Sequence, residues 1–509
     1  MTRNDTKPIL AAGLLVLGLL DGSAALAVNQ VRIGDSDLPG DAIRRTIEKQ
    51  AEARGRGVSI TGSVSEMTVR PSPDDRVHVQ ANLGFWSDVE EWMLRVEKEF
   101  DVEILEGPDT VAIRVELPEL EGHKRARVHY DITLTVTVPV STPLEISNEF
   151  GSVDVEGIKG PARIHNSSGE ISLSQAAGAV DLEGRFGAIR VLDVQGDVKA
   201  ENSSGELEVH GISGRADLGT QFGDLILEDV GGAVVARVQS GGIRASNLRG
   251  DVNLTGSFGE ASIEQVHGSL TAVVESGSLT ALDIRKGADL EASFGTVTAG
   301  RIGADLIVRA RSGGITVSDL RGGLRAEGSF GDVEVRGVAG PVVVSLESGN
   351  VTLADVRGDA EIGCSFGTVR AGDVKGNLSV NGQSTPVQAE RITGGVIVET
   401  TFGGVSVAGA GGGITVRNQS GSVTVKGLTG AALTAEHRID TSFGDIRFAW
   451  PKGSGATFSL ESTFGSIRTG LPLTVRESSS RTTADGTTGD ARARITLSAE
   501  SGSVIVEED

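Results

Sequence analysis

Cysteine and large aromatic residues are scarce in this chain. Its 509 residues include one cysteine, Cys364, three tryptophans and one tyrosine. A single cysteine excludes an intramolecular disulfide framework and a zinc site built from several cysteines. Proline occurs only 13 times and the glycines follow no three-residue period. The composition therefore also excludes a collagen-like triple helix.

Positive charge is in short supply as well. The chain has 47 lysines and arginines against 69 aspartates and glutamates, which gives a formal net charge of -22. A nucleic-acid-binding protein needs a basic surface that displaces counterions, so this class is excluded. Apolar residues make up 38% of the chain, which is enough for a buried core and unlike a disordered chain.

Long apolar runs are absent except near the N-terminus. Residues 9–20 are an unbroken run of apolar residues and glycine, preceded by Arg3 and Lys7 and followed by Ala25-Leu26-Ala27. The run is too short to span a bilayer comfortably and suits a secretory signal. We expect residues 1–27 to be a signal peptide, with an uncleaved membrane anchor as the alternative. No transmembrane segment is expected in the mature chain.

What the chain has in excess is glycine, with 71 residues, and a strict internal repeat. Phe-Gly pairs recur every 36 residues and Ser-Gly pairs lie midway between them, so the repeating unit has 18 residues. Sixteen such units fill 150–437 without an insertion or deletion. The phenylalanines of these pairs are Phe150, Phe186, Phe222, Phe258, Phe294, Phe330, Phe366 and Phe402.

Each unit, numbered from its phenylalanine or serine, has a fixed pattern. Positions 4, 6, 13 and 15 are mostly aliphatic, and a spacing of two is that of a strand with one buried face. Positions 2 and 11 are mostly glycine, as a tight corner requires where φ is positive or backbones approach closely. The first glycines of position 2 that follow a phenylalanine are Gly151, Gly187, Gly223 and Gly259.

A unit of this size cannot bury its own apolar face, but stacked units form one continuous core. We therefore predict an all-β fold, a single-stranded parallel β-solenoid (β-helix) with one coil per unit and a length of about 75 Å. A β-propeller would need longer, four-stranded blades joined by hairpins. A transmembrane barrel would need lipid-facing aromatic girdles, which the sequence lacks.

The alternation of phenylalanine and serine predicts a packed corner in which each ring lies over a small side chain. The residue two before each phenylalanine is mostly small, as at Gly256 and Cys364, and larger before serine, as at Val274 and Leu346. We expect the phenylalanines and the following glycines to form a structural corner ladder. Replacing Phe258 by alanine would then cost about 3–5 kcal/mol. The alternative is an exposed row that binds a partner.

Residues 28–149 are expected to form an N-terminal capping region of strands and one or two helices. One helix is predicted over Asp41–Arg54. A second is predicted after Ser87, which would form a capping box with Glu90. Its apolar face would comprise Val89, Trp92, Met93, Val96 and Phe100. Strands are predicted over 57–69, 76–83, 111–117 and 127–140.

Residues 438–509 are expected to form irregular C-terminal coils and a cap, because the period slips there. Phe443 and Phe464 follow their predecessors by 41 and 21 residues. The polar residues 477–490 predict an exposed loop. Val504 and Val506 would then close a final coil after Ser501-Gly502.

The repeated strands SG-x-[IV]-x-V and FG-x-[IV]-x-V resemble those of the bacterial putative-adhesin family of β-strand-repeat proteins, an exported domain of unknown function. The run RVHYDITLTVTVPVSTPLEISNEFGSVDVEG is similar to the segment that leads into that family's solenoid, and ITLSAESGSVIVEE to its last strands. The resemblance covers about 55–509. It implies an exported bacterial β-solenoid and brings no catalytic residues.

Two motifs are typical of ligand-binding sites. Calcium-binding β-rolls also have 18-residue coils, but turn aspartates occur here in only six coils, mostly not adjacent. They are Asp193, Asp229, Asp283, Asp319, Asp355 and Asp373. Two Arg-Gly-Asp triplets, at 249–251 and 357–359, are attributed to the corner glycine and to chance. No metal and no cofactor are therefore expected.

Repetition argues against catalysis, because eight equivalent Ser-Gly pairs cannot all be nucleophiles. We expect a non-enzymatic protein, an adhesin-like binding surface or structural spacer of the bacterial envelope, in the periplasm or at the cell surface. It would be a monomeric rod with an unidentified protein or glycan ligand. The alternatives are a β-helix enzyme that acts on polysaccharide, which would need paired carboxylates, and an envelope sensor that packs on a regulatory partner.

Overall fold

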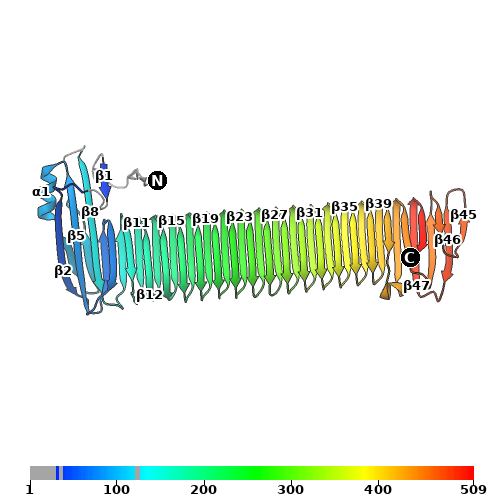
Figure 1. Ribbon diagram of the computed structural model, residues 1–509, viewed down its shortest axis with the longest axis horizontal. Coiled ribbons are helices and arrows are strands. Elements are labelled where there is room, and N and C mark those ends of the chain that lie inside the picture. The colour runs from blue at the N-terminus through cyan, green and yellow to red at the C-terminus, as the bar shows by residue number, and fades with distance from the viewer. Residues whose placement is uncertain (1–29, 34–37, 121–125) are drawn as a thin grey trace, which may run out of the picture.

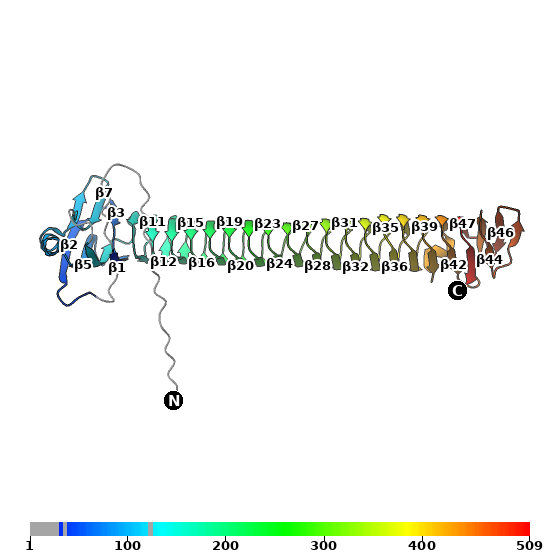
Figure 2. The ribbon, with the colours of Figure 1, turned by 90° about the horizontal axis from the view of Figure 1, so that it is seen from above.

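The computed structural model describes residues 30–33, 38–120 and 126–509. The predicted signal peptide, residues 1–27, lies outside the described residues. The chain forms a long straight rod with a wider N-terminal end, and its strands lie side by side across the rod (Figure 1). Seen from above, the rod consists of two layers (Figure 2). Among the described residues, no helix is long and apolar enough to cross a membrane.

The predicted parallel β-solenoid of about 18-residue coils is confirmed. Each coil contributes one strand to each of two parallel sheets, called sheet A and sheet B here. Strand partners are 18 residues apart, as in Val153↔Ile171 of sheet A and Ala162↔Val180 of sheet B. The 18-residue period of the sequence therefore sets the pairing register of both sheets.

The strands of sheet A within the solenoid run from about position 4 to position 9 of each unit. They are β10 (Ser152–Glu156), β12 (Ile171–Ala177), β14 (Ile189–Gln195), β16 (Leu207–Ile212), β18 (Leu225–Val230), β20 (Ile243–Leu248), β22 (Ala261–Val266), β24 (Leu279–Ile284), β26 (Val297–Ile302), β28 (Ile315–Leu320), β30 (Val333–Val338), β32 (Val351–Val356), β34 (Val369–Val374), β36 (Val387–Ile392), β38 (Val405–Ala410) and β40 (Val423–Lys426).

The strands of sheet B run from position 13 to position 1 of the next unit, so they end on the phenylalanine or serine. They are β11 (Ala162–Ser168), β13 (Val180–Phe186), β15 (Val198–Ser204), β17 (Ala216–Phe222), β19 (Val234–Ser240), β21 (Val252–Phe258), β23 (Leu270–Ser276), β25 (Ala288–Phe294), β27 (Leu306–Ser312), β29 (Leu324–Phe330), β31 (Val342–Ser348), β33 (Ala360–Phe366), β35 (Leu378–Ser384), β37 (Val396–Phe402) and β39 (Ile414–Ser420).

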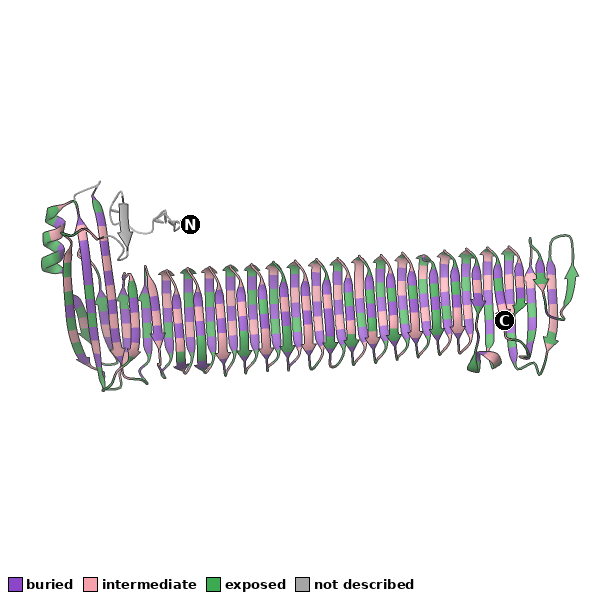
Figure 3. Ribbon diagram, in the orientation of Figure 1, coloured by how far each residue is buried: buried purple, intermediate pink, exposed green. Residues whose placement is uncertain are grey.

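The core is a continuous column of aliphatic side chains between the two sheets. Leu207, Val209 and Ile212 of sheet A are buried, as are Val198 and Ala200 of sheet B. These residues hold positions 4, 6, 9, 13 and 15, which the sequence pattern assigned to the core. Buried and more accessible residues alternate along nearly every strand (Figure 3), as expected when one face of each sheet packs inward.

Each sheet A strand bends at position 8, where the backbone is left-handed. The φ angle is 58° at Asp283, 56° at Arg301 and 53° at Asn247. The bend explains how positions 6 and 9, three residues apart, both face the core. Aspartate, asparagine and glycine tolerate this conformation best, which accounts for their frequency at this position.

The N-terminal cap extends both sheets with strands that are partly antiparallel. On the sheet A side, β2 (Ile43–Glu52), β5 (Arg76–Ser87) and β8 (Arg127–Val138) are antiparallel neighbours. On its other edge β8 pairs in parallel with β1 (Gln30–Ile33) and with β4 (Glu66–Pro71), and β4 pairs with β10.

On the sheet B side the order is β6 (Val102–Glu106), β7 (Thr110–Val115), β3 (Gly57–Gly62), β9 (Leu144–Asn148) and then β11. The helix α1 (Glu90–Glu99) connects β5 of one side to β6 of the other. It lies at the outer end of the rod (Figure 1).

The predicted helix over Asp41–Arg54 is wrong, because this segment forms β2. Ile43, Ile47 and Ala51 recur every four residues, a spacing that fits one face of a helix and also the inward side of a strand. The segment forms a strand because all ten residues of β2 pair with β5.

The second predicted helix is confirmed as α1, and its apolar face buries Trp92, Val96 and Phe100. Its predicted capping box is wrong. Val89 is the N-cap residue and no side chain caps it. The hydroxyl of Ser87 instead accepts a hydrogen bond from the Val89 amide at 3.2 Å.

The C-terminal end of the rod is built from strands whose order in space differs from their order in the sequence. They are β41 (Glu436–Phe443), β42 (Ile446–Trp450), β43 (Ala456–Ser462), β44 (Ile467–Thr469), β45 (Thr474–Glu477), β46 (Thr482–Thr488), β47 (Ala493–Ser501) and β48 (Val504–Glu508), preceded by the 3₁₀ turn η2 (Gly430–Thr434). β47 inserts between β41 and β43, and β48 between β42 and β44.

Two C-terminal expectations are corrected by this order. The coil of Val504 and Val506 is not the outermost one, because it lies inside the stack. The segment 477–490 is not simply a loop, since β46 pairs antiparallel with β43 and β45. The returning chain lets the C-terminus end within a paired region.

The core of the C-terminal end is aromatic. His437, Phe448, Trp450 and Phe458 are at most 1% exposed, and the His437 ring lies edge-on to Phe448 and Trp450 with centroids 5.9 Å apart. Nε2 of His437 donates to the Ala432 carbonyl oxygen at 2.7 Å. Burial lowers the pKa of His437 from its ordinary value of 6.5, because the charged ring loses its hydration.

This lowered pKa predicts that acid weakens the C-terminal end. Below about pH 6.5 the histidine of the unfolded chain is protonated, whereas His437 of the folded chain is still neutral. The unfolded state therefore binds more protons, and the free energy of unfolding falls as the pH falls. The melting temperature should drop between about pH 7.5 and pH 5 more steeply for the natural protein than for His437→Phe. His267→Gln, at a half-buried histidine, should keep the steep dependence. Equal slopes in the natural protein and His437→Phe would contradict the prediction.

Candidate functional site

The row of phenylalanines lies along one edge of the rod, where the strands of sheet B end. From Phe222 to Phe402 each pairs in register with the serines of the coils before and after it, as in Ser240↔Phe258↔Ser276. From Phe186 to Phe402 the rings are 51–64% exposed, and Phe150 at the N-terminal end is half-buried. The prediction that these rings pack inside a corner is therefore wrong.

The reason lies in the turn that follows. Strict alternation would place positions 13, 15, 17 and 1 on the same face of the strand. In β21 (Val252–Phe258) the burial alternates through Val252, Leu254 and Gly256, but Phe258, which alternation would place inward, is exposed. The chain is already leaving the sheet here to enter the corner at Gly259. The ring therefore points away from the core.

The volume compensation seen in the sequence is real, but it concerns position 17 inside the core. A Cβ at Gly328 would lie 3.0 Å from the Leu346 side chain of the next coil. A Cβ at Gly184 would likewise lie 3.0 Å from the Asn202 amide oxygen. Small residues at this position therefore make room for larger ones in the following coil, and the exposed ring plays no part.

Some of the larger position-17 residues are buried asparagines that hold the corner. The side-chain amide of Asn202 donates to the carbonyl oxygens of Gly187 at 2.9 Å and Gly205 at 3.1 Å. Asn418 donates in the same way to Gly403 and Gly421, both at 3.0 Å. Inward carbonyls of the corner thus gain donors that the sheet does not supply.

The glycines of position 2 are required for two reasons. Their φ angles lie in the left-handed region, at 95° for Gly151, 130° for Gly187, 153° for Gly223 and 129° for Gly259. A Cβ at Gly259 would also lie 2.1 Å from the Gly241 carbonyl oxygen of the preceding coil. Backbone touches backbone at this corner, so any side chain would push two coils apart.

The row continues into the C-terminal end, although the sequence period breaks there. Phe443 is 56% and Phe464 is 69% exposed. The inserted strand β47 places Ser501 next to Phe443, and the Phe464 amide bonds to the Glu500 carbonyl oxygen at 2.8 Å. Phenylalanine and serine therefore still alternate in space, because a distant strand supplies the serine.

Three of the six aspartates that suggested a ligand, Asp229, Asp283 and Asp373, are bound by side chains of the next coil. Arg301 Nε lies 2.6 Å from Asp283, and Arg391 Nε lies 2.8 Å from Asp373. Asp359 of one Arg-Gly-Asp triplet accepts the Asn377 amide at 2.7 Å. Within the described ranges, no group of three or more histidine, cysteine or acidic side chains is placed to hold a metal ion.

Asp251 of the other triplet accepts the Ser269 amide at 2.8 Å. Hydrogen bonds from the backbone and hydroxyl of Ser269, and the nearby Lys286, hold the pKa of the Asp251 carboxyl at about 2. The carboxylate thus ties one coil to the next. Both triplets have this structural role at the corner.

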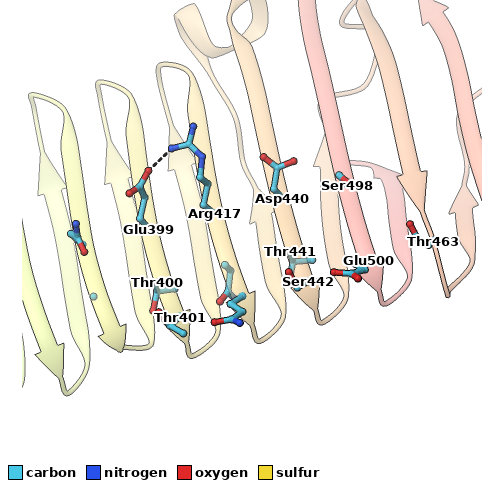
Figure 4. Close-up of a pocket in the computed structure, with 14 residues that line it drawn as sticks. Glu399, Thr400, Thr401, Arg417, Asp440, Thr441, Ser442, Thr463, Ser498 and Glu500 are labelled. Atoms are coloured by element: carbon cyan, nitrogen blue, oxygen red, sulfur yellow. Dashed lines mark hydrogen bonds and ion pairs between the residues drawn. The ribbon is translucent and has the colours of Figure 1, made fainter.

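A shallow hollow of about 590 Å³ lies beside the row at its C-terminal end. Figure 4 shows Glu399, Arg417 and Asp440 on neighbouring strands. Glu399 forms an ion pair with Arg417, and Asp440 pairs with Arg438 at 2.7 Å. The hollow is polar and open, and these two carboxylates are each neutralised by an arginine.

The two-sheet parallel stack defines the chain as a β-strand-repeat solenoid protein. Residues 296–507 match the family described as Toastrack DUF4097. The expected resemblance to an adhesin-like β-repeat family of unknown function is confirmed by this match. No curated protein matches the sequence.

Three solved structures also resemble the chain. A putative cell adhesion protein from Clostridium sporogenes is 7% identical, with 92% of this chain and 100% of that chain covered and a TM-score of 0.15. A putative adhesin from Bacteroides fragilis is 11% identical, with 57% and 97% covered and a TM-score of 0.16. A putative adhesin from Parabacteroides distasonis is 13% identical, with 75% and 100% covered and a TM-score of 0.15.

The corner contact predicts that Gly259→Ala is strongly destabilising. The new methyl group would meet the Gly241 carbonyl and would need a left-handed backbone, so we expect a loss of about 2–4 kcal/mol. Gly219→Ala is the matched control, because its nearest contact would be Glu201 at 3.6 Å. Urea unfolding should separate the two variants, and equal midpoints would contradict the close contact.

The exposed rings predict a small effect for Phe258→Ala, below about 1 kcal/mol. Phe458→Ala should cost about 3–5 kcal/mol, because Phe458 is 1% exposed whereas Phe258 is 57% exposed. Both values follow from urea unfolding of the two variants beside the natural protein. A large loss for Phe258→Ala would show that its ring is packed after all.

Proposed function

We propose that this protein is an exported, non-enzymatic rod that serves as an adhesin-like binding surface or spacer of the bacterial envelope. The observation that carries the proposal is the unbroken stack. From β10 to β40 each coil repeats the same pair of strands with only short connections. A polysaccharide-cleaving β-helix builds its cleft from long loops between coils, and this part of the chain has no room for one.

The carboxylates at the surface also support a role without catalysis. Glycoside hydrolysis needs one carboxyl group that can give up a proton and a second one close by. The hollow beside the row is lined by Glu399, Asp440 and Glu500, and the first two each lie in an ion pair with an arginine. Both of these carboxylates are thus held by an arginine of the protein and are not free to act as the pair that hydrolysis needs.

A stiff stack of equal coils suits repeated weak binding. Every outward position recurs at strand spacing, about 4.8 Å per coil, so a ligand with several similar groups could be bound at several places at once. Linked weak contacts reach a high total affinity without a deep pocket. The same stiffness suits a spacer that holds one end of the chain away from a surface.

Binding of the purified protein to a glycan array and to bacterial envelope fractions tests the proposal. We expect retention of a glycan or an envelope protein, with no product released from any polysaccharide. The double variant Glu399→Gln/Asp440→Asn should bind as the natural protein does, because no chemistry depends on these carboxylates. Release of oligosaccharides by the natural protein would overturn the proposal.

A further inference from the structure

We propose that two copies of this chain pack side by side in opposite directions, with the phenylalanines of each copy filling the serine gaps of the other. The surface is called the phenylalanine edge. It comprises Phe186, Phe222, Phe258, Phe294, Phe330, Phe366, Phe402, Phe443 and Phe464, which are 51–69% exposed. This inference goes beyond the proposed function, and it replaces the monomer expected from the sequence.

The spacing of the rings is the first argument. Successive rings are two strands apart, because a serine such as Ser276 lies between Phe258 and Phe294 in register. At about 4.8 Å per strand the rings of one copy are about 9.6 Å apart. Aromatic rings pair at centroid distances of about 4.5–7 Å, so neighbours within one copy are too far apart to pair.

If a second copy places its row of rings one coil out of step with the first row, the distance along the rod between neighbouring rings of the two copies is half as large. Each incoming ring then lies over a serine, about 4.8 Å along the rod from the rings on either side. The alternation of large and small residues thus supplies both the knobs and the holes. A second copy of this chain carries the same interval over the same length.

Symmetry fixes the direction. If a two-fold axis ran along the rods, Phe258 would face Phe258 at the same level and the rings would collide. If the axis crosses the rods, one copy can shift by a single coil, so that each phenylalanine meets a serine. The interface is then isologous and closes as a dimer. The straight rod in Figure 1 allows contact along the whole edge.

The area is sufficient. A phenylalanine side chain that is about half exposed presents about 100 Å² to solvent, so nine rings offer about 900 Å² per copy. A stable protein interface buries about 800 Å² on each partner. The C-terminal end contributes its full share, because the inserted Ser501 preserves the gap between Phe443 and Phe464.

The surroundings of the rings are compatible with a like-charged partner. The residue before each ring is mostly small and uncharged: Ser257, Ser293, Ser329, Ser365, Thr401, Ser442 and Thr463. On the other side, Asp224 and Asp332 accept backbone amides of the next coil at 2.7 and 2.8 Å. The net charge of -22 still opposes association, so salt should strengthen the dimer.

Sedimentation equilibrium of the purified protein without any ligand tests the proposal. We expect the mass of a dimer, more stable at about 1 M than at about 0.01 M salt. The variant Phe258→Ser/Phe294→Ser/Phe330→Ser removes six rings from the dimer and should raise the dissociation constant at least about 100-fold. The control Leu94→Ser/Leu105→Ser/Ile397→Ser removes exposed apolar side chains away from the edge and should leave the dissociation constant unchanged.

A second variant separates interlocking from mere stickiness. Ser276→Phe/Ser312→Phe fills two holes and adds apolar surface, so interlocked rings predict weaker association and a merely adhesive edge predicts stronger association. Stronger association, or a monomer at about 100 μM natural protein, would overturn the proposal. A monomer that binds glycans through the edge would also overturn it while supporting the proposed function. A dimer that binds no envelope ligand would support the dimer and contradict the proposed function.

Discussion

The fold depends on the direct contact of backbone with backbone where one coil turns above another. At Gly259 and at Gly268, the two corners of one coil, a Cβ would come within 2.1–2.2 Å of a carbonyl oxygen of the preceding coil. At these two glycines a side chain would not fit at strand spacing, and this spacing permits the backbone hydrogen bonds of both sheets. The 18-residue period is thus the length of a coil without a loop, and the longer segment between Ile414 and its partner His437 keeps the register because it contains the additional turn η2.

The same constraint creates the problem of the two ends, where a parallel stack would leave unpaired edges. At the N-terminus the parallel order gives way to antiparallel strands, and α1 buries Trp92 and Phe100. At the C-terminus the chain first forms β43 to β46 and then returns, so that β47 and β48 insert between earlier strands of the stack. The outermost strands there, β44 and β45, have only three and four residues. Short edges offer little backbone to another chain.

Much of this fold could be predicted from sequence because the repeat states the same pattern sixteen times. Regions without repetition were harder. In β2 the apolar residues Ile43, Ile47 and Ala51 suit a helix equally well, and only the distant pairing with β5 distinguishes the two. The insertion of β47 between β41 and β43 has no local signal at all, since it is a choice among edges that are far apart in sequence.

The candidate site shows a different limit. The positions of the phenylalanines were evident, but their direction was not, because alternation predicts that Phe258 shares a face with Leu254. Alternation fails at the last residue of the strand, Phe258, because the chain turns into the corner there. A helpful signal was the glycine that follows, since a left-handed residue must already leave the sheet.

The two alternations of the chain, one inside and one outside, then have separate causes. Inside, Gly328 makes room for Leu346, and this fit would be unaffected if Phe330 were a serine, because position 1 does not enter the core. Outside, the corner needs only Gly331, whose φ is 122°. Neither the core nor the corner therefore requires a large ring at position 1. A ring that contributes little to its own fold and recurs at a constant interval exposes apolar surface at a cost in solubility, and this cost is offset only where something covers the row.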